Sequence, residues 1–229
     1  MIGTELLDDP HADPVAVRSE LRDIARLNGL FGGTRAVVEA LEPCFAKAGK
    51  GATWTLLDVG TGLGDIPRAA AAAARRHGIT LRLVGVELNR AAAAAARRAD
   101  GDGGFELILA DGGALPLPPR SVDVVIVSQV LHHLPPEVTV RWIASLSALA
   151  RRAVVLADLR RSLVAMGAVW LVSFPLGLGA VTRHDAVLSL RRGYTRSEFN
   201  QLLAAAGAPP VARYRPGFRV VAAWDPSGC

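Results

Sequence analysis

Between residues 53 and 160, short apolar runs alternate with helical segments, and this alternation restricts the fold more than any other feature. The runs cover residues 55–59, 81–88, 105–110, 122–127 and 153–159. Most of them are almost continuously apolar, as expected for strands that helices cover on both faces. The pattern therefore predicts an α/β fold with a mostly parallel sheet.

The segments between these runs, residues 66–76, 90–98 and 136–149, are helical in composition. Two of them contain six consecutive alanines, and alanine has the highest helix propensity. Further on, Thr195 and Glu198 form a capping-box pattern that opens a helix through Ala206. Two β-rich runs follow, 211–215 and 218–224, separated only by Pro216-Gly217, which predicts a hairpin.

Neither a linker nor an internal repeat divides the chain, so we predict one domain over residues 1–229. Its parts are an N-terminal helical cap (1–52), a core (53–160), a lid (161–194) and a C-terminal helix and hairpin (195–229). Within the cap, apolar residues from Leu21 to Leu30 recur at helical spacing. Asn28-Gly29 and Gly32-Gly33 are expected to interrupt the cap before a second helical run at 37–45.

The lid contains an apolar run at residues 163–181, long enough to span a membrane. Pro175 and three glycines interrupt this run, and it lies between elements of a soluble fold. We therefore expect a lid or pocket wall after the fifth strand. Peripheral contact with a membrane surface stays open.

Arginine supplies 24 of the 26 basic residues, and the formal net charge is +5. Such a charge can indicate a nucleic-acid partner. Here the arginines occur as scattered pairs, mostly at the ends of apolar or alanine-rich segments, and no run of five or six basic residues is present. The pattern disfavours a nucleic-acid partner, and no feature points to an oligomeric state.

The two cysteines, Cys44 and Cys229, are far apart and lack the spacing of metal ligands. This favours a reduced, cytoplasmic compartment. The first ten residues are acidic and lack the pattern of a signal peptide.

The strongest local motif is Leu56-Leu-Asp-Val-Gly-Thr-Gly-Leu-Gly-Asp65, where an apolar strand turns through three glycines into a helix. Such a loop lets a ligand lie against the backbone at a helix N-terminus. The dinucleotide fingerprint differs, because here the third glycine comes one residue early and Asp65 stands in place of Gly or Ala. A carboxylate would repel a pyrophosphate but is compatible with a ligand that carries an ammonium group.

Acidic residues also end the next two predicted strands. Glu87 is placed to accept hydrogen bonds from ribose hydroxyls, and Asp111 from an adenine amino group. The fourth strand leads into Ser128-Gln-Val-Leu-His-His-Leu134. Because ligands of open α/β sheets bind at the carboxyl ends of the strands, these residues predict one site.

The region from about residue 53 to 159 resembles the class I S-adenosylmethionine-dependent methyltransferase domain. Within that class it is most similar to the enzymes grouped with ubiquinone and menaquinone biosynthesis, through Asp-Val-Gly-Thr-Gly, the Leu-Pro-Leu-Pro stretch after Asp111, and Leu-His-His-Leu. More weakly, Leu6-Leu-Asp-Asp-Pro and the Arg183-His-Asp and Arg-Arg-Gly-Tyr-Thr segments resemble bacterial relatives found with polyketide or isoprenoid pathways of secondary metabolism. The resemblance implies a Rossmann-like seven-stranded, mostly parallel sheet with an antiparallel last strand and helices on both faces.

The resemblance also implies S-adenosylmethionine as cofactor. Its contacts, carried over residue by residue, are Asp58, Gly60, Thr61, Gly62, Gly64, Glu87, Leu88, Asp111, Gly112 and Ser128. In this scheme Asp58 lies beside the ammonium group, Glu87 holds the ribose and Ser128 borders the sulfonium. Nucleic-acid amino-methylating enzymes carry Asn/Asp-Pro-Pro-aromatic after the fourth strand, where this chain has Ser128-Gln-Val-Leu131, and a Pro-Cys nucleophile is also missing. Both absences disfavour base methylation.

Methyl transfer requires positioning of the acceptor and, for many acceptors, removal of a proton. The candidate bases are His132, His133 and His184, with Asp185 placed to orient His184. We select His133 and the His184-Asp185 pair. Asp158 could hold a metal ion, but no second ligand stands at a convincing spacing, so no metal is predicted.

The predicted function is methyl transfer to a lipophilic small molecule, by O- or C-methylation of a phenol, quinol or polyketide-like acceptor. The apolar lid motivates this substrate class. Methylation of protein or RNA is one alternative. A non-catalytic cofactor-binding protein of the same fold is another.

Overall fold

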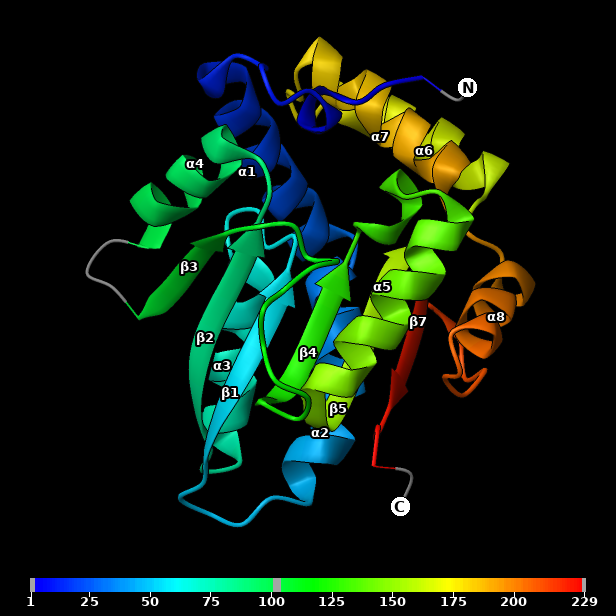
Figure 1. The fold of residues 1–229 in the computed structure, drawn as a ribbon. Helices are drawn as coiled ribbons and strands as arrows, with labels where there is room; N and C mark the ends of the chain where they lie inside the picture. The colour runs from blue at the N-terminus through cyan, green and yellow to red at the C-terminus, as the bar shows by residue number, and fades with distance from the viewer. Residues whose placement is uncertain (1–2, 101–103, 228–229) are drawn as a thin grey trace.

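The computed structural model describes residues 3–100 and 104–227, which fold around a seven-stranded sheet (Figure 1). The strands are β1 (Thr53–Val59), β2 (Thr80–Glu87), β3 (Phe105–Leu109), β4 (Val122–Ser128), β5 (Ala150–Leu159), β6 (Arg213–Arg215) and β7 (Arg219–Trp224). Their order is β3-β2-β1-β4-β5-β7-β6, with β1 to β5 parallel and β7 antiparallel to both β5 and β6. The predicted Rossmann-like fold with an antiparallel last strand is confirmed.

Helices cover both faces of the sheet. They are α1 (Pro14–Leu30), α2 (Gly33–Ala46), α3 (Asp65–Arg76), α4 (Arg90–Asp100), α5 (Pro136–Leu149), α6 (Leu163–Ser173), α7 (Ala180–Arg192) and α8 (Arg196–Ala205), with short 3-10 turns η1 (Leu6–Asp8) and η2 (Leu131–His133). Helices α2 and α3 share one apolar core with the sheet, and α5 and α8 share the other. All seven residues of β4 are buried between these layers, which explains its continuous apolar sequence.

The segments predicted as a lid lie above the carboxyl ends of the parallel strands (Figure 1). Helices α6 and α7 pack on each other there, and the N-terminal segment with η1 runs beside α7. The backbone N–H of Leu6 donates to the Asp185 carboxylate at 2.7 Å, joining two parts of the chain 179 residues apart. The apolar run therefore forms a lid, as predicted, but the N-terminal segment completes it.

The end of α1 and the start of α2, at Leu30 and Gly33, differ from the prediction. Helix α1 continues through Asn28-Gly29 to Leu30, and the chain turns only at Gly32, whose φ is 74°. Asn28 stays helical because its side chain is buried and accepts a hydrogen bond from the Arg219 guanidinium at 3.3 Å. Gly33 then lies so close to Asn28 and Arg219 that a Cβ atom there would be 2.7 Å from the Asn28 amide oxygen.

The long apolar run is divided by the turn between α6 and α7. No helix in the described part of the chain is long and apolar enough to cross a membrane. Of the two cysteines, Cys44 is a free thiol and Cys229 lies outside the described residues, so the compartment inferred from them stays a prediction.

The hairpin turn at Gly217 holds the C-terminal strands against the junction of α1 and α2. Gly217 has a φ of 74°, and a Cβ atom there would lie 1.6 Å from the carbonyl oxygen of Phe31. Gly207, after α8, has nearly the same φ of 73° but open space around it. A side chain at either position would have a strained backbone, but only at Gly217 would it also overlap a neighbouring atom.

We expect Gly207→Ala to lower the free energy of unfolding by about 1–2 kcal/mol, the cost of a left-handed alanine. Gly217→Ala should cost at least about 2 kcal/mol more, or prevent folding, because the strand must move away from Phe31. Urea unfolding followed by circular dichroism measures both values. Equal losses for the two variants would contradict the close approach at Gly217.

Candidate cofactor and acceptor site

The glycine loop after β1 is anchored to β2. The backbone N–H groups of Gly60 and Thr61 donate to the carbonyl of Val86 at 2.8 and 3.1 Å. The glycines at 60, 62 and 64 all have positive φ values, which side chains other than glycine adopt with strain. Helix α3 begins directly after this loop, so its N-terminal N–H groups point toward the space above β1.

Asp58 is buried at the end of β1, where it accepts a hydrogen bond from the Thr61 hydroxyl at 2.7 Å. Burial, together with the nearby charges of Asp65 and Glu87, raises the pKa of Asp58 to about 7, although the hydrogen bond from Thr61 lowers it. The ionised form of Asp58 therefore lacks a positive partner in this structure. An ammonium group beside Asp58 would supply one.

Asp65, at the first position of α3, is the second such carboxylate. Its Oδ2 is buried and has no hydrogen-bond partner among the described residues, and burial raises the pKa of Asp65. A buried and a half-buried carboxylate on either side of a glycine loop do not suit a pyrophosphate. Their chemistry is compatible with an ammonium group, and this role stays a prediction.

Glu87, at the end of β2, bridges two loops. Its Oε2 accepts from Gly62 N–H at 3.1 Å, and its Oε1 accepts from the N–H groups of Leu88 and Asn89 at 3.0 and 3.1 Å. Burial raises the pKa of Glu87 despite these three hydrogen bonds. Oε1 accepts two hydrogen bonds, but Oε2 accepts only one and keeps a lone pair, so Glu87 still has acceptor capacity for a hydroxyl group.

A cavity of about 590 Å³ extends from the glycine loop to the lid. The predicted cofactor residues that line it are Asp58, Gly60, Thr61, Gly62, Glu87, Leu88, Gly112 and Ser128. Gly64 and Asp111 do not line it. Gly64 caps α3, and Asp111 is exposed with its Oδ1 accepting from Gly113 N–H at 2.8 Å. The roles of all ten residues toward the cofactor remain predictions.

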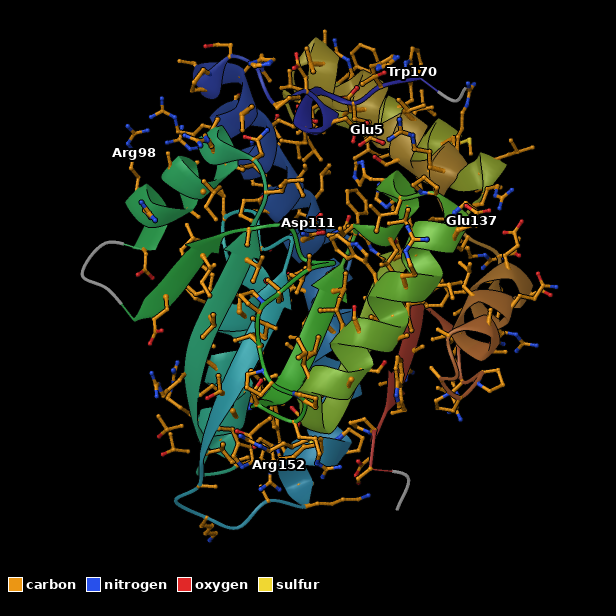
Figure 2. All side chains as sticks on the ribbon, in the orientation of Figure 1. Glu5, Arg98, Asp111, Glu137, Arg152 and Trp170 are labelled. Carbon is orange, nitrogen blue, oxygen red and sulfur yellow. The ribbon has the colours of Figure 1, made fainter. Side chains whose placement is uncertain are left out.

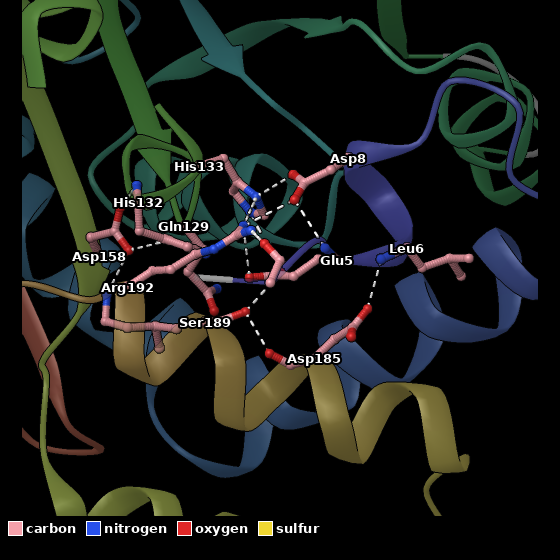
Figure 3. Close-up of polar contacts among 12 residues, drawn as sticks. Glu5, Leu6, Asp8, Gln129, His132, His133, Asp158, Asp185, Ser189 and Arg192 are labelled. Atoms are coloured by element: carbon pink, nitrogen blue, oxygen red, sulfur yellow. Dashed lines mark hydrogen bonds and ion pairs between the residues drawn. The ribbon is translucent and has the colours of Figure 1, made fainter. Parts of the chain in front are cut away.

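His132 and Asp158 form a buried pair at the floor of this cavity (Figure 3). The Nδ1 atom of His132 lies 2.7 Å from Asp158 Oδ1, and its backbone N–H donates to Asp158 Oδ2 at 3.2 Å. Burial opposes the charge of Asp158, but His132 outweighs it and lowers the pKa of this carboxyl. The Nε2 atom of His132 is buried and has no partner among the described residues.

His133 lies beside His132, with ring centroids 4.2 Å apart. Its Nδ1 is 2.7 Å from Asp8 Oδ1, and its Nε2 is 3.8 Å from Glu5 Oε2. Burial disfavours the charged ring, but the hydrogen bond to Asp8 and the charge of Glu5 outweigh burial and raise the pKa of His133. Both histidines line the cavity beside the end of β4, and the role of His133 as a base stays a prediction.

His184 lies elsewhere. Its Nδ1 is 2.8 Å from Asp185 Oδ1, as predicted, but the imidazole is largely exposed and does not line the large cavity. Asp185 does line the cavity and is buried, where it receives the N–H of Leu6. The geometry therefore gives no support to His184 as a base, because consecutive helical residues point in different directions and only Asp185 faces this cavity.

The site contains charged residues that the sequence did not identify. Arg192 donates to Glu5 Oε1 at 3.2 Å and to Asp8 Oδ2 at 3.0 Å, closing the polar end of the lid (Figure 3). Glu20, on α1, is buried and lines the cavity, and burial together with Asp185 and other carboxylates raises its pKa to about 8. In the sequence, the one indication of this cluster was that the segments around Leu6 and Arg192 weakly resemble other methyltransferases.

Comparison with known proteins identifies the core. Residues 57–169 match the family model described as a methyltransferase domain. No curated protein matches the sequence of this chain. Many solved structures share the fold.

Three of these structures illustrate the likeness. Human N-acetylserotonin methyltransferase in complex with S-adenosylmethionine has a TM-score of 0.63 and 11% identity, over 92% of this chain and 56% of that chain. A methyltransferase from Aquifex aeolicus has a TM-score of 0.59 and 18% identity, over 92% and 97%. Magnesium protoporphyrin IX methyltransferase from Synechocystis PCC 6803 has a TM-score of 0.53 and 19% identity, over 83% and 82%. This chain thus spans little more than half of the human enzyme.

The fold, the glycine loop and the acidic strand ends define a class I methyltransferase. With the family match, they identify residues 57–169 as a methyltransferase domain, and solved structures of the same fold include S-adenosylmethionine-dependent methyltransferases. When bound, S-adenosylmethionine supplies a methyl group already activated by its sulfonium.

Because the pKa of Asp58 is raised to about 7, we expect cofactor affinity to depend on pH. An ammonium ligand favours the ionised carboxylate, so affinity for S-adenosylhomocysteine should rise by up to about tenfold per pH unit below about pH 7 and level off above it. By the same linkage, the unliganded protein should lose stability as pH rises through this range. Calorimetric titration between about pH 5.5 and about pH 8 measures the effect.

Asp58→Asn should weaken binding and flatten this pH dependence. Any slope that remains would come from Asp65 and Glu87, whose pKa values burial also raises. Affinity that falls with pH in the wild type, or an unchanged slope in the variant, would contradict the assignment of Asp58.

Proposed function

We propose that the protein transfers the methyl group of S-adenosylmethionine to an oxygen or carbon atom of a lipophilic small molecule, such as a phenol, quinol or polyketide-like compound. The observation that carries this proposal is the single cavity that joins the cofactor-binding strand ends to the lid. A methyl donor held at the glycine loop and an acceptor held under the lid would share this space.

The lid end of the cavity supports an apolar acceptor. Its wall includes Leu27, Phe31, Ala165, Val169, Leu190 and Phe218. Apolar walls bury the carbon skeleton of a ligand, while a few polar groups set its orientation. Two enzymes of similar fold have names that specify small-molecule acceptors, N-acetylserotonin and magnesium protoporphyrin IX. The sequence resemblance to quinone-biosynthesis methyltransferases favours a quinol or phenol in this chain.

The histidine pair is proposed to contact the reacting group. His132 and His133 follow Ser128 closely in the chain and line the same cavity. Among the described residues, they are the histidines that line this cavity, and they follow the end of β4. In the transfer a bond from the acceptor atom to the methyl carbon forms, the methyl–sulfur bond breaks and leaves S-adenosylhomocysteine, and the proton of the acceptor passes to the histidine pair or to water. The main task of the protein is to hold the two reactants in line.

Methylation of protein or RNA receives less support from the surface charge. The arginine pairs are distributed over several elements, and Figure 2 shows Arg98 and Arg152 far from each other and from the lid. Among the described residues, Arg219 is the one arginine that lines the cavity, and it is buried. A non-catalytic role is disfavoured because the cofactor and acceptor ends of the cavity are both formed.

We expect turnover of radiolabelled S-adenosylmethionine with at least one member of a panel of alkylphenols and alkylquinols. His132→Asn should lower kcat for that acceptor by about 100-fold or more, since contacts of this kind contribute 10²–10⁴-fold. His184→Asn is the matched control and should leave kcat unchanged. Binding of S-adenosylhomocysteine verifies that both variants are folded.

Failure of every acceptor in the panel, with intact cofactor binding, would exclude this substrate class. Equal activity of the two histidine variants would exclude contact between His132 and the reacting group.

The outer face of the lid supports a second partner, a membrane surface that holds the acceptor. Leu163, Val164, Trp170, Leu171 and Phe174 are each at least 50% exposed. Figure 2 shows Trp170 on the lid, and Arg160 and Arg161 directly precede α6. Exposed apolar side chains of this kind mark contact surfaces, and nearby arginines are attracted to anionic lipid.

We therefore expect the protein to float with vesicles that contain anionic lipid. The double variant Leu171→Glu, Phe174→Glu should remain at the bottom of the gradient. Val15→Glu changes an equally exposed apolar residue on α1 and should float like the wild type. Flotation of the double variant would exclude α6 as the contact surface.

A further inference from the structure

Each of the two histidines of η2 has a carboxylate at its Nδ1 atom. The Nδ1 atom of His132 is held by Asp158 and that of His133 by Asp8, each at 2.7 Å. A neutral ring that donates its Nδ1 hydrogen to a carboxylate presents Nε2 as a free lone pair, and a metal ion binds the ring in this neutral form. This is the arrangement that carboxylates impose on metal-binding histidines.

Both histidines lie beside Glu5 (Figure 3). One ligand atom each from Glu5, His132 and His133 lies within 4.8 Å of the other two. His133 Nε2 is 3.8 Å from Glu5 Oε2, and His132 Nε2 is buried without a partner among the described residues. Buried polar atoms normally have a hydrogen-bond partner. The ion pairs of the two histidines do not supply one to His132 Nε2, whereas a bound metal ion would.

We propose that Glu5, His132 and His133 bind a divalent transition-metal ion of the Zn²⁺ type. Two imidazole nitrogens and one carboxylate oxygen form a donor set that Zn²⁺ accepts, with further positions left for water or substrate. Metal–ligand distances near 2.1 Å correspond to separations of roughly 3.3 Å between ligand atoms. The three ligand atoms here lie within 4.8 Å of one another, so shifts of about 1 Å in the side chains complete the site.

The residues around the group support its geometry. Arg192 occupies Oε1 of Glu5, which leaves Oε2 directed toward His133. The Ser189 hydroxyl donates to that same Oε2 at 2.8 Å and fixes the rotamer of Glu5. The carboxylates of Asp158 and Asp8 are the outer partners of the two rings. The site therefore needs the N-terminal segment, the loop after β4 and α7 together.

The role of this ion rests on the function proposed above. An ion between these ligands faces the cavity at the end where the histidine pair is proposed to contact the acceptor. A phenol or quinol hydroxyl bound to such an ion has a lower pKa, and its proton passes to water. The sequence predicted no metal because it considered only Asp158, which instead orients His132.

The test uses the full chain after dialysis against a chelator. Calorimetric titration with Zn²⁺ should show about one ion bound per chain with micromolar or tighter affinity. Titration with Co²⁺ should produce the visible absorption of a nitrogen-coordinated ion. Glu5→Gln and His132→Asn should each weaken binding at least tenfold, whereas His184→Asn, which alters an exposed histidine beside a carboxylate, should have no effect.

Retained S-adenosylhomocysteine binding shows that the variants are folded. Absence of Zn²⁺ binding to the wild type, or equal binding by the Glu5, His132 and His184 variants, would overturn the site. Binding at this site without turnover of any acceptor would support the site and refute the proposed reaction. Turnover that is unaffected by removal of bound Zn²⁺ would overturn the catalytic role of the ion.

Discussion

The hydrogen bonding of β1 along both of its edges is the constraint on which the site depends. Residues 56–59 pair with β2 on one side and with β4 on the other, all in parallel. Parallel neighbours require crossover connections, so the chain leaves β1 toward one edge of the sheet and later returns to the opposite side. The divergence opens a crevice at the carboxyl end of β1, and the glycine loop and Asp58 lie at its base.

That crevice explains why buried carboxylates persist in an otherwise apolar core. Asp58, Asp65 and Glu87 lie where strands end and backbone N–H groups become available, so their burial is only partly compensated. A cationic ligand completes the compensation. The carboxylates of the lid differ, because Arg192 forms ion pairs with both Glu5 and Asp8 within the protein.

The sequence was sufficient for features whose cause is local. Asp58 and Glu87 could be predicted because each ends an apolar strand and precedes a turn, and the hairpin could be predicted from Pro216-Gly217. The helical continuation through Asn28 could not, since its cause is Arg219, 191 residues away. Glu5 and Arg192 likewise meet across 187 residues, and no periodicity links them. Whether His132 or His184 faces inward depended on the orientation of η2 and α7, which packing decides.

The cavity wall is divided between two sets of segments. Its cofactor end is built from the strand ends of the sheet, whereas its lid end comes from α1, α6, α7 and the N-terminal segment, which the sheet does not require for its hydrogen bonding. Substitutions in the lid can therefore accumulate without disturbing the donor-binding loop. Relatives with the same core can thus diverge in acceptor choice, and exchanging the lid segments between them offers a direct route to altered specificity.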